Sequence, residues 1–153
     1  MDSFDLQILQ VLQEDASLAV AAVAERVGLS PTPCWRRIQK MEASGIIRAR
    51  VALLDAAQLD LGLTVFVHLR IARHGTDWLD QFTSAIMAMD EVLEVNRLAG
   101  NWDYLLRVLV ADMPAYDEFY KRLIEIDGLN DVSSSFSMQQ IKYTTALPLG
   151  GRA

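Results

Sequence analysis

The chain has 153 residues, of which 52% are hydrophobic and 22% are charged, and its formal net charge is −6. This composition is ordinary for a folded, soluble protein with one core or two small ones. No apolar run approaches the roughly 20 residues that span a bilayer. The acidic N-terminus does not resemble a signal peptide, and one cysteine cannot form an internal disulfide. We therefore expect a cytoplasmic protein with no membrane partner.

Two short helices are predicted first. Residues 2–15 open with acidic side chains suited to a helix start and carry apolar residues at helical spacing. A second helix is predicted over residues 20–27, and Gly28 is expected to end it.

A third helix is predicted between Ser30 and Gly45. The Ser30 hydroxyl is expected to accept from the free amides of the first turn, and Pro31 falls at the first helical position, where a missing N–H costs nothing. Gly45 is the residue type expected just past a helix end. The apolar residues recur at i, i+4 and i+7 and form one buried stripe, made of Cys34, Ile38 and Met41.

The other side chains of this helix form a basic face. Residues 26–50 contain six basic side chains and one acidic side chain, a local charge of +5 in an anionic chain. DNA affinity depends on the local field, and a basic, half-buried helix after a short helix and a glycine turn is the recognition half of a helix-turn-helix. We predict contacts with double-stranded DNA from Ser30, Thr32, Pro33, Trp35, Arg36, Arg37, Gln39 and Lys40, and from Arg48 and Arg50 on the strand of a small wing over residues 46–53.

Several of these residues have a competing interpretation. A charge run is often only a solvated face, and the sequence does not assign which basic residue reads bases rather than phosphates. Trp35 can contact a thymine methyl or a sugar, or it can pack against the neighbouring helix. Cys34 can be proposed as a thiol sensor, but its place on the apolar stripe favours a small buried hydrophobe.

Beyond a linker at residues 54–63, the hydrophobic period changes to two at Thr64. The predicted order is strand, helix, strand, strand, helix, strand: 64–71, 76–89, 92–98, 104–110, a helix from 114, and 132–139. We therefore predict an α+β protein with an N-terminal winged helix-turn-helix (residues 1–53) and a C-terminal ferredoxin-like βαββαβ domain (residues 64–153) for effector binding and assembly. Its two helices should cover one sheet face, and the other face, with Phe66, Leu105 and Leu109, should pack against a partner subunit.

The turn from Gly100 to Tyr104 is either a plain strand connection or a binding site for an amino acid. Gly100 permits close backbone approach to a carboxylate, Asp103 suits an ammonium, and Trp102 supplies a wall for a side chain. Serines on the last strand and residues 138–140 are candidates for the opposite wall. The predicted effector site comprises Gly100, Asn101, Trp102, Asp103, Tyr104, Ser134 and Ser135.

Catalytic and metal-binding patterns are missing from the sequence. His68 and His74 have no cysteine or acidic partner at metal spacing, and we interpret both as structural or surface residues. No nucleophile elbow, phosphate loop or paired catalytic acids occur. We predict no catalysis, no metal and no cofactor, only a small amino-acid effector.

These motifs together resemble the Lrp/AsnC, or feast/famine, family of bacterial and archaeal transcription regulators. The resemblance covers nearly the whole chain and rests on Val27–Asp55, Gly100–Val108 and Ser135–Leu149. The cysteine-responsive branch is most similar, through Pro33–Trp35, Val110–Met113, Tyr116–Leu123 and Gln140–Pro148. The family commonly begins its second helix with serine or threonine, where this chain has Ala19, so DNA contacts are not carried over to that helix.

The resemblance implies a sequence-specific, nucleoid-associated transcription regulator that responds to cysteine or another small neutral amino acid. It also implies homodimers assembled into octamers, with effectors bound near the Gly100 turn at contacts between dimers. An alternative is an amino-acid-binding metabolic regulatory module whose N-terminal helices only mediate assembly. The +5 charge of residues 26–50 favours the first hypothesis, because assembly alone does not need it.

Overall fold

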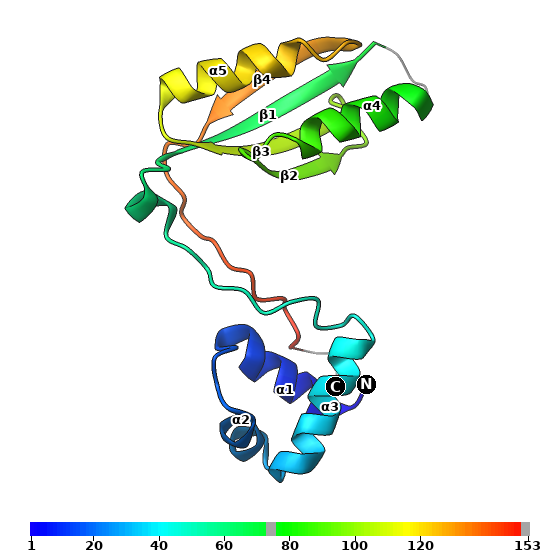
Figure 1. Ribbon diagram of the computed structural model, residues 1–153, viewed down its shortest axis with the longest axis vertical. Coiled ribbons are helices and arrows are strands. Elements are labelled where there is room, and N and C mark those ends of the chain that lie inside the picture. The colour runs from blue at the N-terminus through cyan, green and yellow to red at the C-terminus, as the bar shows by residue number, and fades with distance from the viewer. Residues whose placement is uncertain (73–75, 151–153) are drawn as a thin grey trace. The chain divides into compact units, whose positions relative to one another are not determined.

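The computed structural model describes residues 1–72 and 76–150 and divides into two compact units (Figure 1). The first unit comprises Met1–Leu53 and the tail from Lys142, and the second comprises Leu54–Ile141. The tail, which the sequence analysis placed in the second domain, is thus grouped with the first unit. The Leu147 amide donates to Gln13 Oε1 at 2.9 Å and the Gln13 side-chain amide donates to the Leu147 carbonyl at 3.1 Å, which ties the tail to the first helix.

Three helices form the first unit: α1 (Ser3–Glu14), α2 (Val20–Val27) and α3 (Pro31–Ala43). The side chains of Asp2 and Asp5 each accept from the other's backbone amide, a capping box that starts α1. Gly28, with φ +72°, ends α2 in the left-handed conformation that glycine adopts without strain. The shared core contains Ile8, Leu12, Val23, Ala24, Val27, Cys34, Ile38 and Met41.

Helix α3 begins after Ser30 as predicted, but the Ser30 hydroxyl makes no capping hydrogen bond. A capping side chain accepts from the second or third amide of the helix. The third position here is Pro33, which has no N–H, so only the Thr32 amide is left to donate. The predicted cap was wrong, because one of its two possible donors is missing and the Thr32 amide does not bond to the Ser30 hydroxyl.

The predicted wing strand is not formed. Residues 46–55 contain no strand, and between them and the sheet lies the short helix η1 (Ala56–Leu59), capped by Asp55. A strand needs a partner for its backbone groups, and the described part of the first unit offers none. Val51 and Leu53 are left mostly exposed. Residues 46–55 are therefore an extended segment in the described chain.

The second unit is a four-stranded antiparallel sheet with two helices, in the predicted ferredoxin-like order. Its elements are β1 (Leu63–Ile71), α4 (Thr76–Met87), β2 (Val92–Arg97), β3 (Tyr104–Val110), α5 (Met113–Ile124) and β4 (Leu129–Phe136). The strand order across the sheet is β2-β3-β1-β4, so β1 and β3 are central. Val67 of β1 lies opposite Leu106 of β3 and Ser134 of β4.

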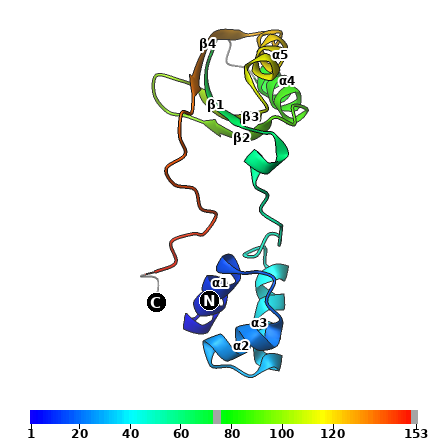
Figure 2. The same cartoon turned by 90° about the vertical axis from the view of Figure 1, so that its left-hand side faces the viewer.

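Both helices cover the same face of the sheet, as Figure 2 shows. Along β1 and β3, burial alternates residue by residue, so that one set of side chains is buried under the helices and the other is only partly covered. The buried set packs with Phe82, Phe119 and Leu123 of the helices. The other face, which we call the open face, carries Thr64, Phe66, His68, Leu105, Arg107, Leu109, Ser133 and Ser135.

Gly128 is expected to be indispensable for the second unit. Its φ of +88° is left-handed, and an added Cβ would lie 2.8 Å from Trp78 Cδ1. We expect Gly128→Ala to destabilise the unit by about 2–4 kcal/mol, from backbone strain plus overpacking. Thermal unfolding measures this loss. Gly62→Ala, where the nearest atom to the new Cβ is 3.8 Å away, is the control, and an equal effect of both changes would refute the close-packing argument.

Candidate nucleic-acid interface and effector site

Helix α3 presents one exposed face whose residues follow helical spacing. Thr32, Trp35, Arg36, Gln39 and Lys40 lie at i, i+3, i+4, i+7 and i+8 and are all exposed. Trp35 is 51% exposed, so it does not pack into the neighbouring helix. Arg36 and Lys40 have no ion-pair partner in the part of the chain that the structure describes. Cys34, Ile38 and Met41 occupy the opposite, buried face, which orients the basic side chains outward.

Ser30 and Pro33 complete the exposed N-terminal end of α3. This end carries the unused Ser30 hydroxyl and the Thr32 side chain. In helix-turn-helix proteins the N-terminal residues of the recognition helix contact base edges, so the placement of both residues suits that role.

Arg37, another of the predicted DNA contacts, is held by ion pairs within the first unit. Its Nη1 lies 2.8 Å from Asp2 Oδ2 and 2.7 Å from Asp5 Oδ1, and its guanidinium stacks over the Phe4 ring at 5.7 Å. These contacts fasten α3 to the start of α1. The sequence missed them because Asp2 and Asp5 are more than 30 residues away along the chain.

Of the two predicted wing cations, Arg50 is paired and Arg48 is not. Arg50 Nη2 lies 2.9 Å from Glu42 Oε1, and Gln39 donates to the other oxygen of Glu42 at 2.8 Å. Arg48 is exposed and has no such partner within the described ranges. Both lie on an extended segment, not on a wing.

The Arg37 ion pairs predict an acid-sensitive first unit. The pKa of Asp2 is lowered from 3.8, chiefly by the Asp5 amide and then by Arg37; for Asp5, burial raises the pKa but the Asp2 amide and Arg37 outweigh it. Because the pKa values of both carboxyl groups are lower in the folded state than the usual 3.8, the ionised carboxylates stabilise the folded unit above pH 3.8. This stability is lost as the pH falls through the lowered pKa values and the carboxylates become protonated. We expect Arg37→Gln to reduce the melting temperature at pH 7 and to flatten its decline below about pH 4, measured by circular dichroism. The control Arg48→Gln should change neither the melting temperature at pH 7 nor its decline in acid. If Arg37→Gln kept the acid profile of the wild type, the stabilising role of the Arg37 ion pairs would be contradicted.

The turn between β2 and β3 is fixed by hydrogen bonds of Asp103. Its carbonyl accepts from the Leu98 amide at 2.8 Å, its amide donates to the Leu69 carbonyl at 2.9 Å, and its Oδ2 accepts from the Ile71 amide at 2.8 Å. This last bond holds the irregularity between Arg70 and Ile71 at the end of β1. Asp103 is therefore structural through Oδ2, while Oδ1 has no partner among the described residues.

The amides of Gly100, Asn101 and Trp102 have no acceptor in the described parts of the chain. Beside them lies Arg70, whose Nε donates to the Asn101 carbonyl at 3.0 Å and whose guanidinium stacks over the Trp102 ring at 4.8 Å. The Trp102 ring also contacts His68 on the open face, with centroids 5.6 Å apart. The sequence did not identify Arg70, because its nearness to the turn follows from the register of β1 with β3.

Three other predicted effector residues lie away from this group. Tyr104 is buried under the helices against Phe82, at 4.9 Å between ring centroids, so its predicted contact with an effector was wrong. Ser134 points to the helix-covered side, where its hydroxyl is hydrogen-bonded to that of Tyr116. Ser135 is on the open face, opposite Phe66 and across β1 from the turn. Neither serine forms the opposite wall of a site with Trp102 within one chain.

Cys34 is fully buried, and burial raises the pKa of its thiol. A reactive thiol needs exposure and a lowered pKa, so the buried-hydrophobe interpretation is favoured over a thiol sensor.

Within residues 1–72 and 76–150, no group of three potential metal ligands is found, and no helix is long and apolar enough to cross a membrane. His68 belongs to the open face, whereas His74 lies outside the described residues.

A three-helix unit with an outward basic helix, followed by a ferredoxin-like unit, defines a helix-turn-helix protein with a separate regulatory domain. Comparison with known families agrees with this definition. The AsnC-type helix-turn-helix domain matches residues 1–42, and the Lrp/AsnC ligand binding domain matches residues 64–147. The chain belongs to the Lrp/AsnC family and is a DNA-binding transcriptional regulator.

Individual relatives match over almost their full length. The DNA-binding transcriptional activator DecR of Escherichia coli K12 is 49% identical over 97% of this chain and 99% of its own length. The glutamate uptake regulatory protein of Zymomonas mobilis is 48% identical over 97% of this chain and 91% of its own length.

Two solved structures share the fold. An AsnC family regulator from Agrobacterium tumefaciens has a TM-score of 0.94 and 56% identity, covering 97% of both chains. A Neisseria meningitidis transcriptional regulator in complex with L-Met has a TM-score of 0.95 and 40% identity, covering 100% of this chain and 99% of that one.

Proposed function

We propose that this regulator senses a small neutral amino acid at the turn formed by residues 100–103 and thereby changes its binding to DNA. The observation that carries the proposal is the row of three unbonded amides at Gly100, Asn101 and Trp102, flanked by a guanidinium and a carboxylate in the described chain. The amides and Arg70 suit the effector carboxylate, and Asp103 Oδ1 suits its ammonium. The Trp102 ring supplies an apolar wall for the side chain.

The motifs shared with the cysteine-responsive branch favour cysteine as the effector. The L-Met complex of the Neisseria regulator adds methionine as a second candidate. Both side chains are neutral and contain sulfur, and contacts of sulfur with an aromatic ring are favourable.

The exposed face of α3 supports binding in a DNA major groove, with Trp35, Arg36, Gln39 and Lys40 as the contacts. We propose a homodimer that pairs two recognition helices on a pseudo-palindromic site and assembles further, to an octamer by family resemblance. The effector site is then completed by a neighbouring subunit, since one chain supplies only one wall. The protein acts by binding, without catalysis, in the cytoplasm at the nucleoid.

An effector alters DNA binding only by its difference in affinity for two arrangements of the assembly. The alternative, a metabolic regulatory module whose N-terminal helices only mediate assembly, lacks support. Trp35 is exposed beside Arg36 and Lys40, and neither cation has an ion-pair partner in the described chain. Assembly alone does not require such a surface.

The matched change Asp103→Asn tests the effector site. The asparagine oxygen can still accept from Ile71, so the fold is kept, but the charge that attracts an ammonium is removed. We expect the half-effective concentration of L-Cys or L-Met to rise about tenfold or more, with effector-free DNA affinity unchanged. Fluorescence anisotropy on the DNA upstream of the protein's own gene measures both quantities.

Asp90→Asn, an exposed turn carboxylate, is the control and should respond like the wild type. An unaltered response of Asp103→Asn would remove this carboxylate from the effector site. Absence of specific DNA binding in the wild type would instead refute binding at this operator.

A further inference from the structure

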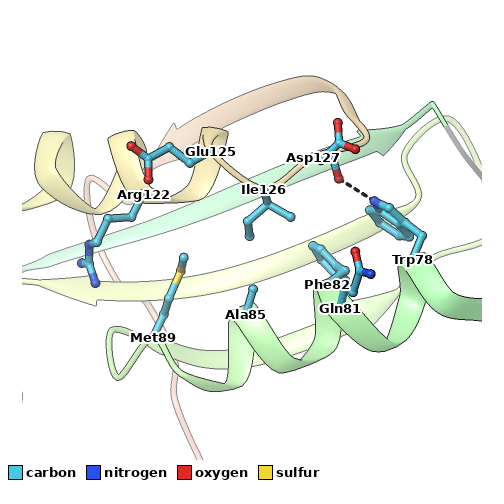
Figure 3. Close-up of a pocket in the computed structure, with 9 residues that line it drawn as sticks. All are labelled: Trp78, Gln81, Phe82, Ala85, Met89, Arg122, Glu125, Ile126 and Asp127. Atoms are coloured by element: carbon cyan, nitrogen blue, oxygen red, sulfur yellow. Dashed lines mark hydrogen bonds between the residues drawn. The ribbon is translucent and has the colours of Figure 1, made fainter.

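A cavity of about 310 Å³ lies between α4 and α5 on the helix-covered side of the sheet (Figure 3). It is separate from the effector turn, whose Trp102 contacts His68 on the open face. At about 30 Å³ for each water, the volume equals roughly ten water molecules, enough for a small organic molecule. The lining residues are Trp78, Gln81, Phe82, Ala85, Met89, Arg122, Glu125, Ile126 and Asp127.

The floor of the cavity is apolar and already formed. Phe82 and Met89, on α4 and just after it, are 2% and 9% exposed, respectively. The Trp78 ring stacks on Phe82 with centroids 4.9 Å apart and planes 13° apart. The Trp78 Nε1–H donates to the Asp127 carbonyl at 2.6 Å, which fixes the ring in place, as the dashed line in Figure 3 shows. A flat apolar ligand would therefore meet a rigid aromatic wall.

The charge at the rim is negative. Arg122, the one cation among the described lining residues, is engaged by the Glu91 carboxylate and also donates to the Glu118 carbonyl at 3.4 Å. The Glu125 carboxylate has no partner within the described chain. It caps the C-terminus of α5, where the helix dipole adds further negative potential. A bound carboxylate would find no free cation among these described residues, whereas an ammonium would find Glu125.

We propose that this cavity binds a small organic ammonium ion with an apolar, preferably aromatic, body and no carboxylate. Its apolar body packs along the floor beside Phe82 and Met89 and against Trp78 (Figure 3), and its ammonium pairs with Glu125. The site thus takes an amine and discriminates against the amino acids that suit the effector turn. The inference does not depend on the proposed effector site.

Isothermal titration calorimetry with 2-phenylethylamine tests the proposal on the full-length protein. We expect saturable binding, and no binding of 3-phenylpropionate, which has a similar shape and the opposite charge. Glu125→Gln should weaken binding about tenfold or more by removing the charged partner. Ala85→Leu should abolish binding by filling the floor. Glu118→Gln, a charge change on the same helix outside the lining, should leave the affinity unchanged.

Thermal melts confirm that each variant is folded before it is titrated. Absence of amine binding to the wild type would overturn the proposal, as would equal binding of the carboxylate. Unchanged affinity in both Glu125→Gln and Ala85→Leu would also overturn it. Loss of amine binding in Asp103→Asn, or competition by L-Met, would place the amine at the effector turn and refute a separate site. If the amino acids failed to alter DNA binding, only the proposed function would be contradicted, and the amine site would not be affected.

Discussion

Replacing both Arg36 and Lys40 with alanine is expected to weaken DNA binding by about 2–4 kcal/mol, roughly 30- to 1,000-fold. These two cations are exposed one turn apart on α3 and have no intramolecular partner within the described residues, so their charge is available to DNA. The slope of log K against log salt should also fall in magnitude, by about 0.9 for each phosphate that the variant no longer neutralises. Anisotropy titrations between about 50 and 200 mM salt, concentrations over which phosphate binding is sensitive, give both values.

The control removes the same charge from the second unit, through Arg97→Ala and Lys121→Ala. Lys121 is paired with Asp117 and Glu118 on α5, and neither control residue belongs to the α3 face. The two double variants have the same net charge. A difference between their DNA affinities therefore depends on where the removed cations lie. Equal losses in both would show that the overall field, not the α3 face, controls binding, and the interface assignment would fail.

Most of the secondary structure followed from the sequence because local pattern decides it, although the last strand spans Leu129–Phe136 instead of the predicted 132–139. Apolar spacing on α3, the Gly28 stop and the alternation of β1 depend on residues a few positions apart. The βαββαβ order was predicted for the same reason, and the boundaries of β3 agree at both ends. The alternation also identified the open face correctly.

The errors share a cause, since they concern partners that no local pattern encodes. Arg37 was predicted only as a DNA contact, and its ion-pair partners at the start of α1 were missed. The wing was predicted from alternation alone, although a strand also needs a neighbour. Tyr104 was placed in the turn by its position in the motif, yet the β3 pleat directs it into the core.

The Ser30 cap shows a different kind of error. All the information needed was local, because Pro33 at the third helical position removes the amide that a capping hydroxyl most commonly uses. Counting the available donors, and not only recognising the capping residue type, would have shown that the Thr32 amide alone is left for this cap.

Phe66→Asp is expected to separate the subunits and, with α3 untouched, to weaken DNA binding by about 10²- to 10⁴-fold. Phe66 lies in the middle of the open face, opposite Arg107 of β3 and Ser135 of β4. In a single chain the new carboxylate would be solvated and close to Arg107, so the unit should fold. Packed against a second open face it would be a buried charge, which costs several kcal/mol.

The effect on DNA follows from the loss of bivalency. When one recognition helix of a dimer is bound, the second is held near the DNA at a high effective concentration. This raises the overall affinity above that of a single helix and accounts for the expected range. Sedimentation velocity measures assembly, and anisotropy on the same operator measures affinity. Ser84→Asp, which adds the same charge to the exposed side of α4, should change neither. If Phe66→Asp kept both its assembly and its affinity, the open face could not be the subunit contact, and the pairing of recognition helices would have to arise from another surface.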